Sequence, residues 1–403
     1  MAAGALMRRR ARAWRACALL AFAWCAQAHA AAPSAFDAFS RADRAEIDRL
    51  VRDVCRRDIV VLGEDANHGA ARTVQVKIAI TQRLVARCGF GAVLFESQVY
   101  DVLDYAHAAA DSRADVAMLA DAVGPVWSRM PETRPLLDWL HGEVVAGRLR
   151  VGGIDPQVGG RTGRYAKMQL GTALASALAE HRRTDCAREF DRHDRWQYDD
   201  ATPFDAAAQT RLRACSDAVR AALAAQGADP ASDLAGMATA YGRYLEMALD
   251  GDGDRRDLGM AELVAWHRTR WPRGTRAIVW CATVHAAKRL DNIAPAMVPM
   301  GTHLARTYGD RVAAIGFSAA GGTFGDQSGA VHALAPAGPE ALETVALADA
   351  RGDLRYLDRR WLRRHGVMSA RPINDRIVHA AAWSEVLDGV MVLREECAPA
   401  SPE

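Results

Sequence analysis

Residues 59–69 read Ile-Val-Val-Leu-Gly-Glu-Asp-Ala-Asn-His-Gly, and residues 92–97 read Ala-Val-Leu-Phe-Glu-Ser. Each segment starts with a short apolar run that can form a buried strand, and each run ends at a glutamate. Residues 70–87 between them have helical periodicity and stop before a glycine, which is a typical helix end. The stretch therefore predicts a strand, a crossover helix and a second, parallel strand.

The two predicted strands carry polar side chains at the point where each strand ends. Glu64 ends the first strand, His68 follows four residues later, and Glu96 ends the second strand. The carboxyl ends of parallel strands open onto the crevice where ligands bind. We therefore expect these three side chains to share the mouth of one pocket.

Further short apolar runs, bounded by polar residues or glycine, predict the rest of the sheet: Leu149–Ile154, Ala277–Cys281, Val312–Phe317 and Val390–Leu393. The fold class is therefore α/β, a mostly parallel sheet flanked by helices. Residues 162–270 differ, because alanine-rich helical segments alternate there with turn signals. We interpret them as an inserted helical subdomain that covers the pocket. The predicted catalytic core then has two parts, residues 31–161 and 271–396.

The beginning of the chain has the anatomy of a signal peptide. A cluster of arginines precedes an apolar segment from Ala16 to Cys25, and Ala28-His29-Ala30 fits a cleavage site. No later segment reaches the roughly 18 apolar residues that a membrane-spanning helix needs. We expect residues 1–30 to be removed, which leaves a periplasmic or secreted protein without stable membrane insertion.

The charge and the cysteines limit the partners. The 403 residues carry a formal net charge of +2, which gives no reason to expect binding to nucleic acid. Export permits disulfides, and Cys55 and Cys88 precede the two opening strands at nearly equal distances. We predict that these two pair because adjacent parallel strands would bring them together. A bridge between Cys186 and Cys215 has weaker support.

Later strand ends add to the candidate site. Asp155 follows the strand at 149–154, and His285 comes shortly after the strand at 277–281. Two histidines and three acids then meet at one edge of the sheet. A neutral imidazole can take a proton from water, and a carboxylate can hold its tautomer, so the set favours hydrolysis by acid–base chemistry. Asp155 and His303 are candidates for contact with the substrate.

Lys77 is the first of only three lysines. On the pocket side of its helix it would bind an acidic group or an oxyanion, and the alternative is a surface lysine.

Two other functions remain open. Histidine and glutamate are also zinc ligands, although the helical His-Glu-x-x-His pattern is absent. In a binding protein without catalysis, the acids at the strand ends would serve recognition instead. No Gly-x-Ser-x-Gly elbow and no glycine-rich phosphate loop occurs, and we expect no cofactor.

An ordered series of motifs resembles the erythromycin esterase family over about residues 58 to 395. The motifs are Leu62-Gly63-Glu64 with His68-Gly69, Lys77, Phe95-Glu96-Ser97, Tyr100-Asp101, Val126-Trp127, Arg134-Pro135-Leu136, Gly153-Ile154-Asp155-Pro156-Gln157, Arg256-Asp257, Met260-Ala261-Glu262, Val279-Trp280, His285-Ala286-Ala287-Lys288, Pro299-Met300-Gly301, Ile315-Gly316-Phe317 and Leu387-Asp388-Gly389.

The resemblance implies a metal-independent hydrolase acting on a small ester or a macrolide-type lactone. His68 would activate water, and Glu64, Glu96 and His285 would position it and the ester. Tyr100 would help to bind the substrate. Lys77 stands where the macrolide esterases have arginine.

This chain departs from the family in its first motif. Three residues separate Glu64 from His68, where the family usually has two. Either Glu64 keeps its role and the loop bulges, or Asp65 takes over the spacing. We favour Glu64 because it directly ends the strand.

Overall fold

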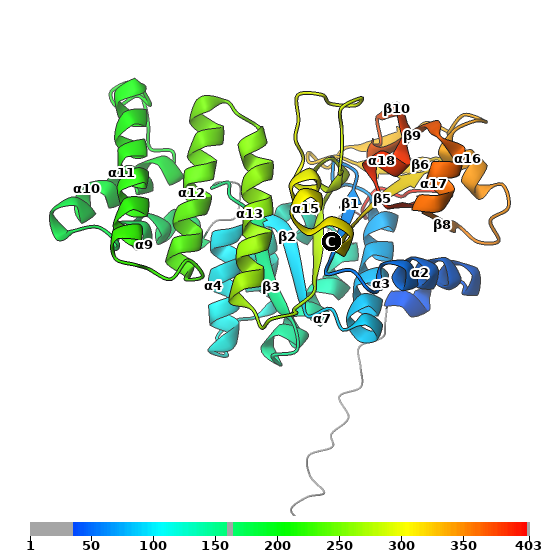
Figure 1. The fold of residues 1–403 in the computed structure, drawn as a ribbon, viewed down its shortest axis with the longest axis horizontal. Helices are drawn as coiled ribbons and strands as arrows, with labels where there is room; N and C mark the ends of the chain where they lie inside the picture. The colour runs from blue at the N-terminus through cyan, green and yellow to red at the C-terminus, as the bar shows by residue number, and fades with distance from the viewer. Residues whose placement is uncertain (1–34, 159–163, 401–403) are drawn as a thin grey trace, which may run out of the picture. The chain divides into compact units, whose positions relative to one another are not determined.

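The computed structural model describes residues 35–158 and 164–400, so the predicted signal peptide lies outside the described residues. Its main sheet lies in the middle of the folded part (Figure 1). In spatial order the strands are β3 (Arg150–Asp155), β2 (Ala92–Gln98), β4 (Ala277–Ala282), β1 (Ile59–Glu64), β5 (Val312–Ala319), β11 (Gly389–Leu393) and β8 (Leu354–Asp358).

The fold class predicted from the sequence is confirmed. Every neighbouring pair in the main sheet is parallel except β8, which runs antiparallel to β11 at the edge. All six predicted strands are present. The sequence did not reveal β8 or two small antiparallel hairpins, which are β6 (Gly322–Gly325) with β7 (Val331–Leu334) and β9 (Val367–Asn374) with β10 (Ile377–Ala382).

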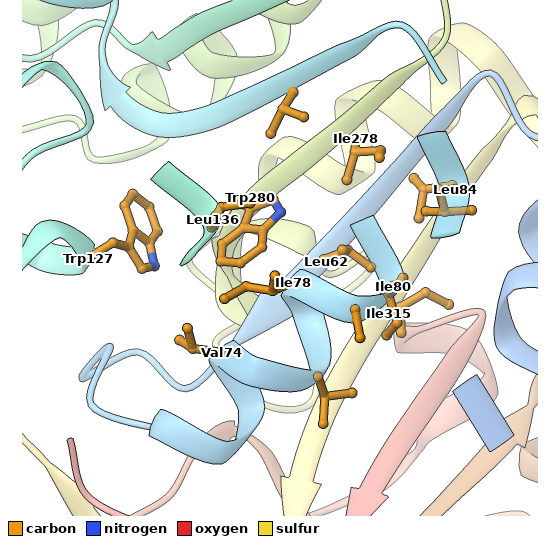
Figure 2. Close-up of a cluster of buried hydrophobic side chains, with 14 of the residues drawn as sticks. Leu62, Val74, Ile78, Ile80, Leu84, Trp127, Leu136, Ile278, Trp280 and Ile315 are labelled. Carbon is orange, nitrogen blue, oxygen red and sulfur yellow. The ribbon is translucent and has the colours of Figure 1, made fainter. Parts of the chain in front are cut away.

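The apolar runs form strands that are buried on both faces. Val60 and Leu62 of β1 belong to one hydrophobic cluster, and Ile59 and Val61 to the cluster on the opposite face. This alternation follows from the two-residue period of a strand. Figure 2 shows Leu62 beside Ile78 of the following helix, within the first cluster.

Helices cover both faces of the sheet (Figure 1). The cluster on one face includes residues of α2 (Arg41–Val54), α3 (Ala71–Cys88), α5 (Val116–Val123), α6 (Pro125–Ser128) and α7 (Arg134–Val145). The other face packs against α9 (Leu170–Ala175), α10 (Glu180–Asp194), α11 (Ala206–Ala225), α12 (Asp233–Asp250), α13 (Asp254–Arg270) and α15 (Met300–Tyr308). The remaining helices are α4 (Val99–Ala110), α8 (Arg164–Met168), α14 (Thr283–Ala286), α16 (Leu342–Leu347), α17 (Arg359–His365) and α18 (Trp383–Val386), with short 3₁₀ turns at Ala35–Ala38, Pro131–Thr133 and Gly309–Arg311.

The crossover helix α3 is fixed at both of its ends. Gly89 follows its last residue with a φ of 68°, a left-handed conformation that glycine adopts without strain. At the other end, the buried carboxylate of Glu396 accepts hydrogen bonds from the backbone N–H groups of Arg72 and Thr73. These N–H groups have no partner within the helix, and the helix dipole favours an anion there. Cys397 adds a backbone contact, because its carbonyl accepts from the N–H of Ala71 at 2.9 Å.

The helices α8 to α13 lie between β3 and β4 in the chain, in the region predicted as an insertion. In Figure 1, α9 to α12 extend sideways from α13, and α13 itself packs along β3. The division of the chain into two core parts around an insertion stays a prediction. Among the described residues, no helix is both long enough and apolar enough to span a membrane.

The predicted disulfide Cys55–Cys88 is present, and so is the bridge Cys186–Cys215, for which the sequence offered weaker support. The reason given for the first was wrong, because β4 lies between β1 and β2 in the sheet. Cys55 and Cys88 are instead brought together by the carboxyl ends of α2 and α3, two helices that pack against each other.

Candidate active site

A cavity of about 530 Å³ lies at the carboxyl ends of the central strands. This volume falls in the range of small-molecule sites. Its wall combines charged side chains, three glutamines and an apolar part. The lining residues are Ala66, His68, Glu96, Ser97, Gln98, Ala122, Val123, Gly124, Pro125, Val126, Asp155, Gln157, Val158, Arg256, Ala282, Val284, His285 and Gln327.

His68 is held from behind by Glu64. The distance from its Nδ1 to Glu64 Oε1 is 2.8 Å, and Glu64 itself is almost completely buried. Lys77 Nζ donates to the other carboxylate oxygen at 2.8 Å, and the indole N–H of Trp127 also donates to Glu64. Burial opposes the charge of Glu64, but Lys77 and His68 outweigh it and lower its pKa. The carboxylate can therefore fix the His68 ring while the Nε2 atom remains for the cavity.

The loop that carries His68 has a tightly defined backbone. His68 has a φ of 56°, a left-handed conformation that is uncommon for residues other than glycine and that occurs often at functional sites. The next residue, Gly69, accepts a hydrogen bond from Gly325 N at 2.8 Å, and a Cβ on Gly69 would lie 2.2 Å from the carbonyl oxygen of Gly325. The β6–β7 hairpin therefore presses on this loop and leaves no space for a side chain there.

The three-residue spacing is accommodated by Asp65, which turns away from His68. Its side chain accepts from the backbone N–H of Asn67 at 2.8 Å and of Asp375 at 2.7 Å. Glu64 keeps the contact with His68, as we favoured from the sequence.

Lys77 does not reach the cavity. Its side chain is fully buried. Its ammonium pairs with Glu64 and lies 4.3 Å from the centre of the Trp280 ring. Of the roles expected for Lys77, only the contact with an acidic group agrees with its position, and that group is Glu64. The oxyanion role and the surface position are wrong, because α3 directs Lys77 beneath the strand end rather than into the cavity.

Another part of the cavity wall is organised by Arg256, from the first turn of α13. Its Nη2 donates to Glu96 Oε1 at 2.8 Å and to Asp155 Oδ2 at 2.7 Å, so one guanidinium joins two strand ends. The second oxygen of Glu96 accepts from the backbone N–H of Ala282 at 2.8 Å. Burial opposes the charge of Glu96, but His285, Arg256 and His68 hold its pKa well below the usual range.

His285 completes this part of the wall. Its Nε2 lies 3.3 Å from Glu96 Oε1 and 2.9 Å from Arg256 Nη1, and its Nδ1 lies 2.9 Å from Asp257 Oδ1. Burial alone would lower the pKa of His285, but Glu96 and Asp257 raise it to about 10. The ring is therefore held as a cation near neutral pH. In the neutral ring Nε2 accepts from Nη1–H of Arg256, whereas in the charged ring Nε2–H pairs with Glu96 instead, because a guanidinium only donates.

The structure brings together most of the predicted site residues. His68, Glu96, Asp155 and His285 line the cavity, and Glu64 lies directly behind His68. Tyr100 does not line it, since it is fully buried and donates its hydroxyl to the carbonyl of Pro156. The predicted role of Tyr100 in binding the substrate is therefore corrected, because the first turn of α4 directs this side chain into the core.

His303 also lies outside the cavity wall, on α15. His303 directly precedes Leu304, and α15 presents Met300 and Leu304 to the core. The candidate role of His303 in contacting the substrate is therefore not supported by its position.

Sequence reasoning assigned no role to several residues that the structure places here. Trp127, Arg256 and Asp257 occur in the motifs of the family resemblance, and that was the only signal for them. Gln98 and Gln327 line the cavity without any signal in the sequence. Both amide atoms of Gln98 are buried, and neither has a hydrogen-bond partner among the described residues.

The carboxylates of the site face protein cations. Glu64 pairs with Lys77, and both Glu96 and Asp155 pair with Arg256. In the described part of the chain, no group of three or more histidine, cysteine or acidic side chains is arranged to hold a metal ion.

A mostly parallel sheet whose strand ends present two histidine–carboxylate pairs has the layout of an α/β enzyme that uses acid–base chemistry. The profile of the erythromycin esterase family matches residues 85–395. The chain belongs to the erythromycin esterase family, which supports a hydrolase that resembles erythromycin esterases. The match includes Glu96 and His285 but begins after Glu64, His68 and Lys77, so geometry alone places His68 in the cavity wall and Glu64 and Lys77 behind it.

Solved structures share the fold. A protein from Bacillus cereus is 17% identical with a TM-score of 0.69, covering 89% of this chain and 93% of its own. A succinoglycan biosynthesis protein is 15% identical with a TM-score of 0.69, at 88% and 91% coverage. A mutant of the erythromycin esterase EreC in its open conformation is 18% identical with a TM-score of 0.67, at 90% and 96% coverage. The search of curated proteins gives no significant match.

Proposed function

We propose that this protein is an exported hydrolase that cleaves a carboxylic ester or a macrolide-type lactone with water activated by His68. The observation that carries the proposal is the pair formed by His68 and the buried Glu64, in a cavity whose wall also holds Arg256 and His285. The wall of one cavity therefore offers both a base and cations. Ester hydrolysis needs both, because a proton leaves water while negative charge develops on the carbonyl oxygen.

His68 acts on the water molecule. Its Nδ1 holds a hydrogen toward Glu64, so Nε2 accepts a proton from water while the oxygen forms a bond to the carbonyl carbon. Glu64 stabilises the imidazolium that results, in the way a carboxylate does in other histidine–carboxylate pairs. Lys77 and Trp127 keep Glu64 in place for this role.

His285 and Arg256 act on the carbonyl oxygen. Both line the cavity and carry positive charge, so they stabilise the oxyanion of the tetrahedral intermediate. When the intermediate collapses, the bond to the alcohol oxygen breaks, and the proton taken up by His68 passes to that oxygen. The products are one carboxylic acid and one alcohol, joined in the same molecule when the substrate is a lactone.

Export is supported by the signal-like first 30 residues and by the two disulfides, since such bridges persist in oxidising compartments. The apolar part of the cavity wall and the three glutamine amides suit an uncharged ester with polar substituents.

The test uses the mature protein with 4-nitrophenyl butyrate and with a 14-membered macrolide lactone, the latter followed by the mass gain of one water. We expect His68→Ala to lower kcat/KM for the cleaved ester by about 10²- to 10⁴-fold, because the general base is lost. Circular dichroism and the unfolding midpoint should remain close to those of the wild type.

His141→Ala is the matched control, because His141 contacts the hydroxyl of Tyr105 and does not line the cavity. Its turnover should equal that of the wild type. Undiminished ester cleavage by His68→Ala would refute the mechanism, and inertness of the wild type toward every ester would favour a binding protein instead.

A further inference from the structure

Asp257 lies behind His285, on the side away from the cavity. It is buried and its carboxylate contacts His285 Nδ1 with both oxygens, at 2.9 and 3.1 Å. Oδ1 also accepts from the backbone N–H of Met300, the first residue of α15, at 2.7 Å. Asp257 therefore has a fixed position between α13, α14 and α15.

This contact determines which ring nitrogen of His285 can change its protonation. A carboxylate only accepts hydrogen bonds, so Nδ1 carries its hydrogen in both the neutral and the charged ring. The nitrogen that gains and loses a proton during titration is therefore Nε2. That atom lies 3.3 Å from Glu96 and 2.9 Å from Arg256, on the cavity side.

The charges around His285 come from three elements. Glu96 faces it from β2, Arg256 and Asp257 face it from α13, and Asp155 of β3 acts through its bond to Arg256. Glu96 and Asp155 both accept from Arg256, so part of their negative charge is balanced there. The partners of Asp257 are His285 and a backbone N–H, so its charge acts mainly on the ring.

We propose that Asp257 is a positioning residue that fixes the His285 ring with Nδ1–H toward α13 and keeps the ring charged, so that a cationic Nε2–H faces the cavity. Its effect on turnover rests on the proposed function, whereas its effect on His285 itself does not. Arg256 and Asp257 are neighbours in the chain, so the first turn of α13 sets both cationic groups of the site.

The first test is the titration of His285 by NMR in the ¹⁵N-histidine-labelled protein, with the signal assigned through His285→Gln. In the wild type we expect both ring nitrogens to carry hydrogen at neutral pH, with a midpoint well above 6.5. Asp257→Asn keeps an acceptor oxygen but removes the charge, so the midpoint should fall by about 1 to 2 pH units.

The second test is the pH profile of 4-nitrophenyl butyrate hydrolysis, corrected for the uncatalysed reaction. The basic limb of kcat should move down by the same amount in Asp257→Asn, with KM nearly unchanged. A purely structural role for Asp257 would lower stability without moving this limb.

Asp254→Asn is the matched control, because Asp254 lies one turn earlier on α13 and accepts from the backbone N–H of Val298 at 2.9 Å. It should leave the His285 midpoint and the basic limb in place. A wild-type midpoint near or below 6.5, or an unchanged midpoint in Asp257→Asn, would overturn the proposal. Because the NMR readout needs no substrate, this outcome is distinct from failure of the proposed hydrolysis.

Discussion

The two histidines of the cavity are each held by a carboxylate, but the charges behind them differ. Behind His68, the negative charge of Glu64 is already neutralised by the ammonium of Lys77. Around His285, three carboxylates meet one guanidinium, and the excess negative charge draws a proton onto the ring. The charges around the two rings therefore differ: those around His285 favour its cationic form, whereas the glutamate behind His68 is already paired with Lys77.

The two sides also differ in their access to water. Lys77 is completely buried, whereas the side chain of Arg256 is 22% exposed and lines the cavity. A buried charge depends on its partner much more than a charge that water can reach. The buried pair of Lys77 and Glu64 should therefore contribute more to stability than the pairs of Arg256.

Removal of the Lys77 charge should give the largest change in stability. Lys77→Met leaves Glu64 buried without its ammonium partner, so we expect the free energy of unfolding to fall by about 3–5 kcal/mol. Urea denaturation at pH 7 measures this. The double variant Lys77→Met/Glu64→Gln removes both charges and should recover most of the loss.

Arg256→Met makes the same kind of change in the cavity wall. Because Arg256 is partly exposed, its loss should cost clearly less stability than the loss of Lys77. Equal losses in the two single variants, or no recovery in the double variant, would contradict the contrast between the two sides.

The raised pKa of His285 predicts a pH-dependent effect on stability. A group whose pKa is higher in the folded state stabilises the fold fully below its unfolded value and loses that contribution as the pH rises through the folded value. For His285 this window runs from 6.5 to about 10. The free energy of unfolding should fall across the window by at most about 1.4 kcal/mol per pH unit.

Urea denaturation from pH 6 to 9.5 measures this slope, and His285→Gln is the reference, because other groups titrate in the same range. The difference between the wild type and His285→Gln should shrink as the pH rises. A difference that stays constant would mean that His285 is not held as a cation.

Substitution of Gln98 should change the free energy of unfolding least, and it should raise this free energy rather than lower it. Its amide is buried at the end of β2 without a hydrogen-bond partner among the described residues, which is unfavourable for the free protein. Gln98→Leu should therefore raise the free energy of unfolding by about 1 kcal/mol. If the amide turns to meet the substrate, the same variant should lower kcat/KM.

Gln157→Leu is the comparison for this change. Gln157 lines the same cavity, and its amide nitrogen contacts the sulfur of Met247 at 3.7 Å. This substitution should leave stability within about 0.5 kcal/mol. Destabilisation by Gln98→Leu would mean that the amide has a partner in solution, such as a water molecule.

The parallel core of the fold could be predicted from the sequence because its strands are continuous apolar runs, and β1 is buried along its whole length. The edge strand β8 and the hairpin β9–β10 could not, since their partly exposed strands mix polar and apolar residues. The order of the strands was also hidden, because only long-range packing places β4 between β1 and β2.

The candidate site shows the same division. Glu64, His68, Glu96 and His285 could be found because each lies at or just after a strand end. Arg256 reaches the cavity from a helix, and no local pattern distinguishes it among the many arginines of the chain. The direction of Lys77 depended on the rotation of α3, which the sequence periodicity does not fix closely enough.

The contact of Glu396 with the start of α3 has a consequence for the order of events during synthesis. More than three hundred residues separate it from Arg72 and Thr73, so the segment just after His68 leaves the ribosome long before its anchor exists. Contacts this distant in sequence form late and slowly. The start of α3, which follows the loop of His68, therefore lacks this anchor until the region of Glu396 has been made and has docked.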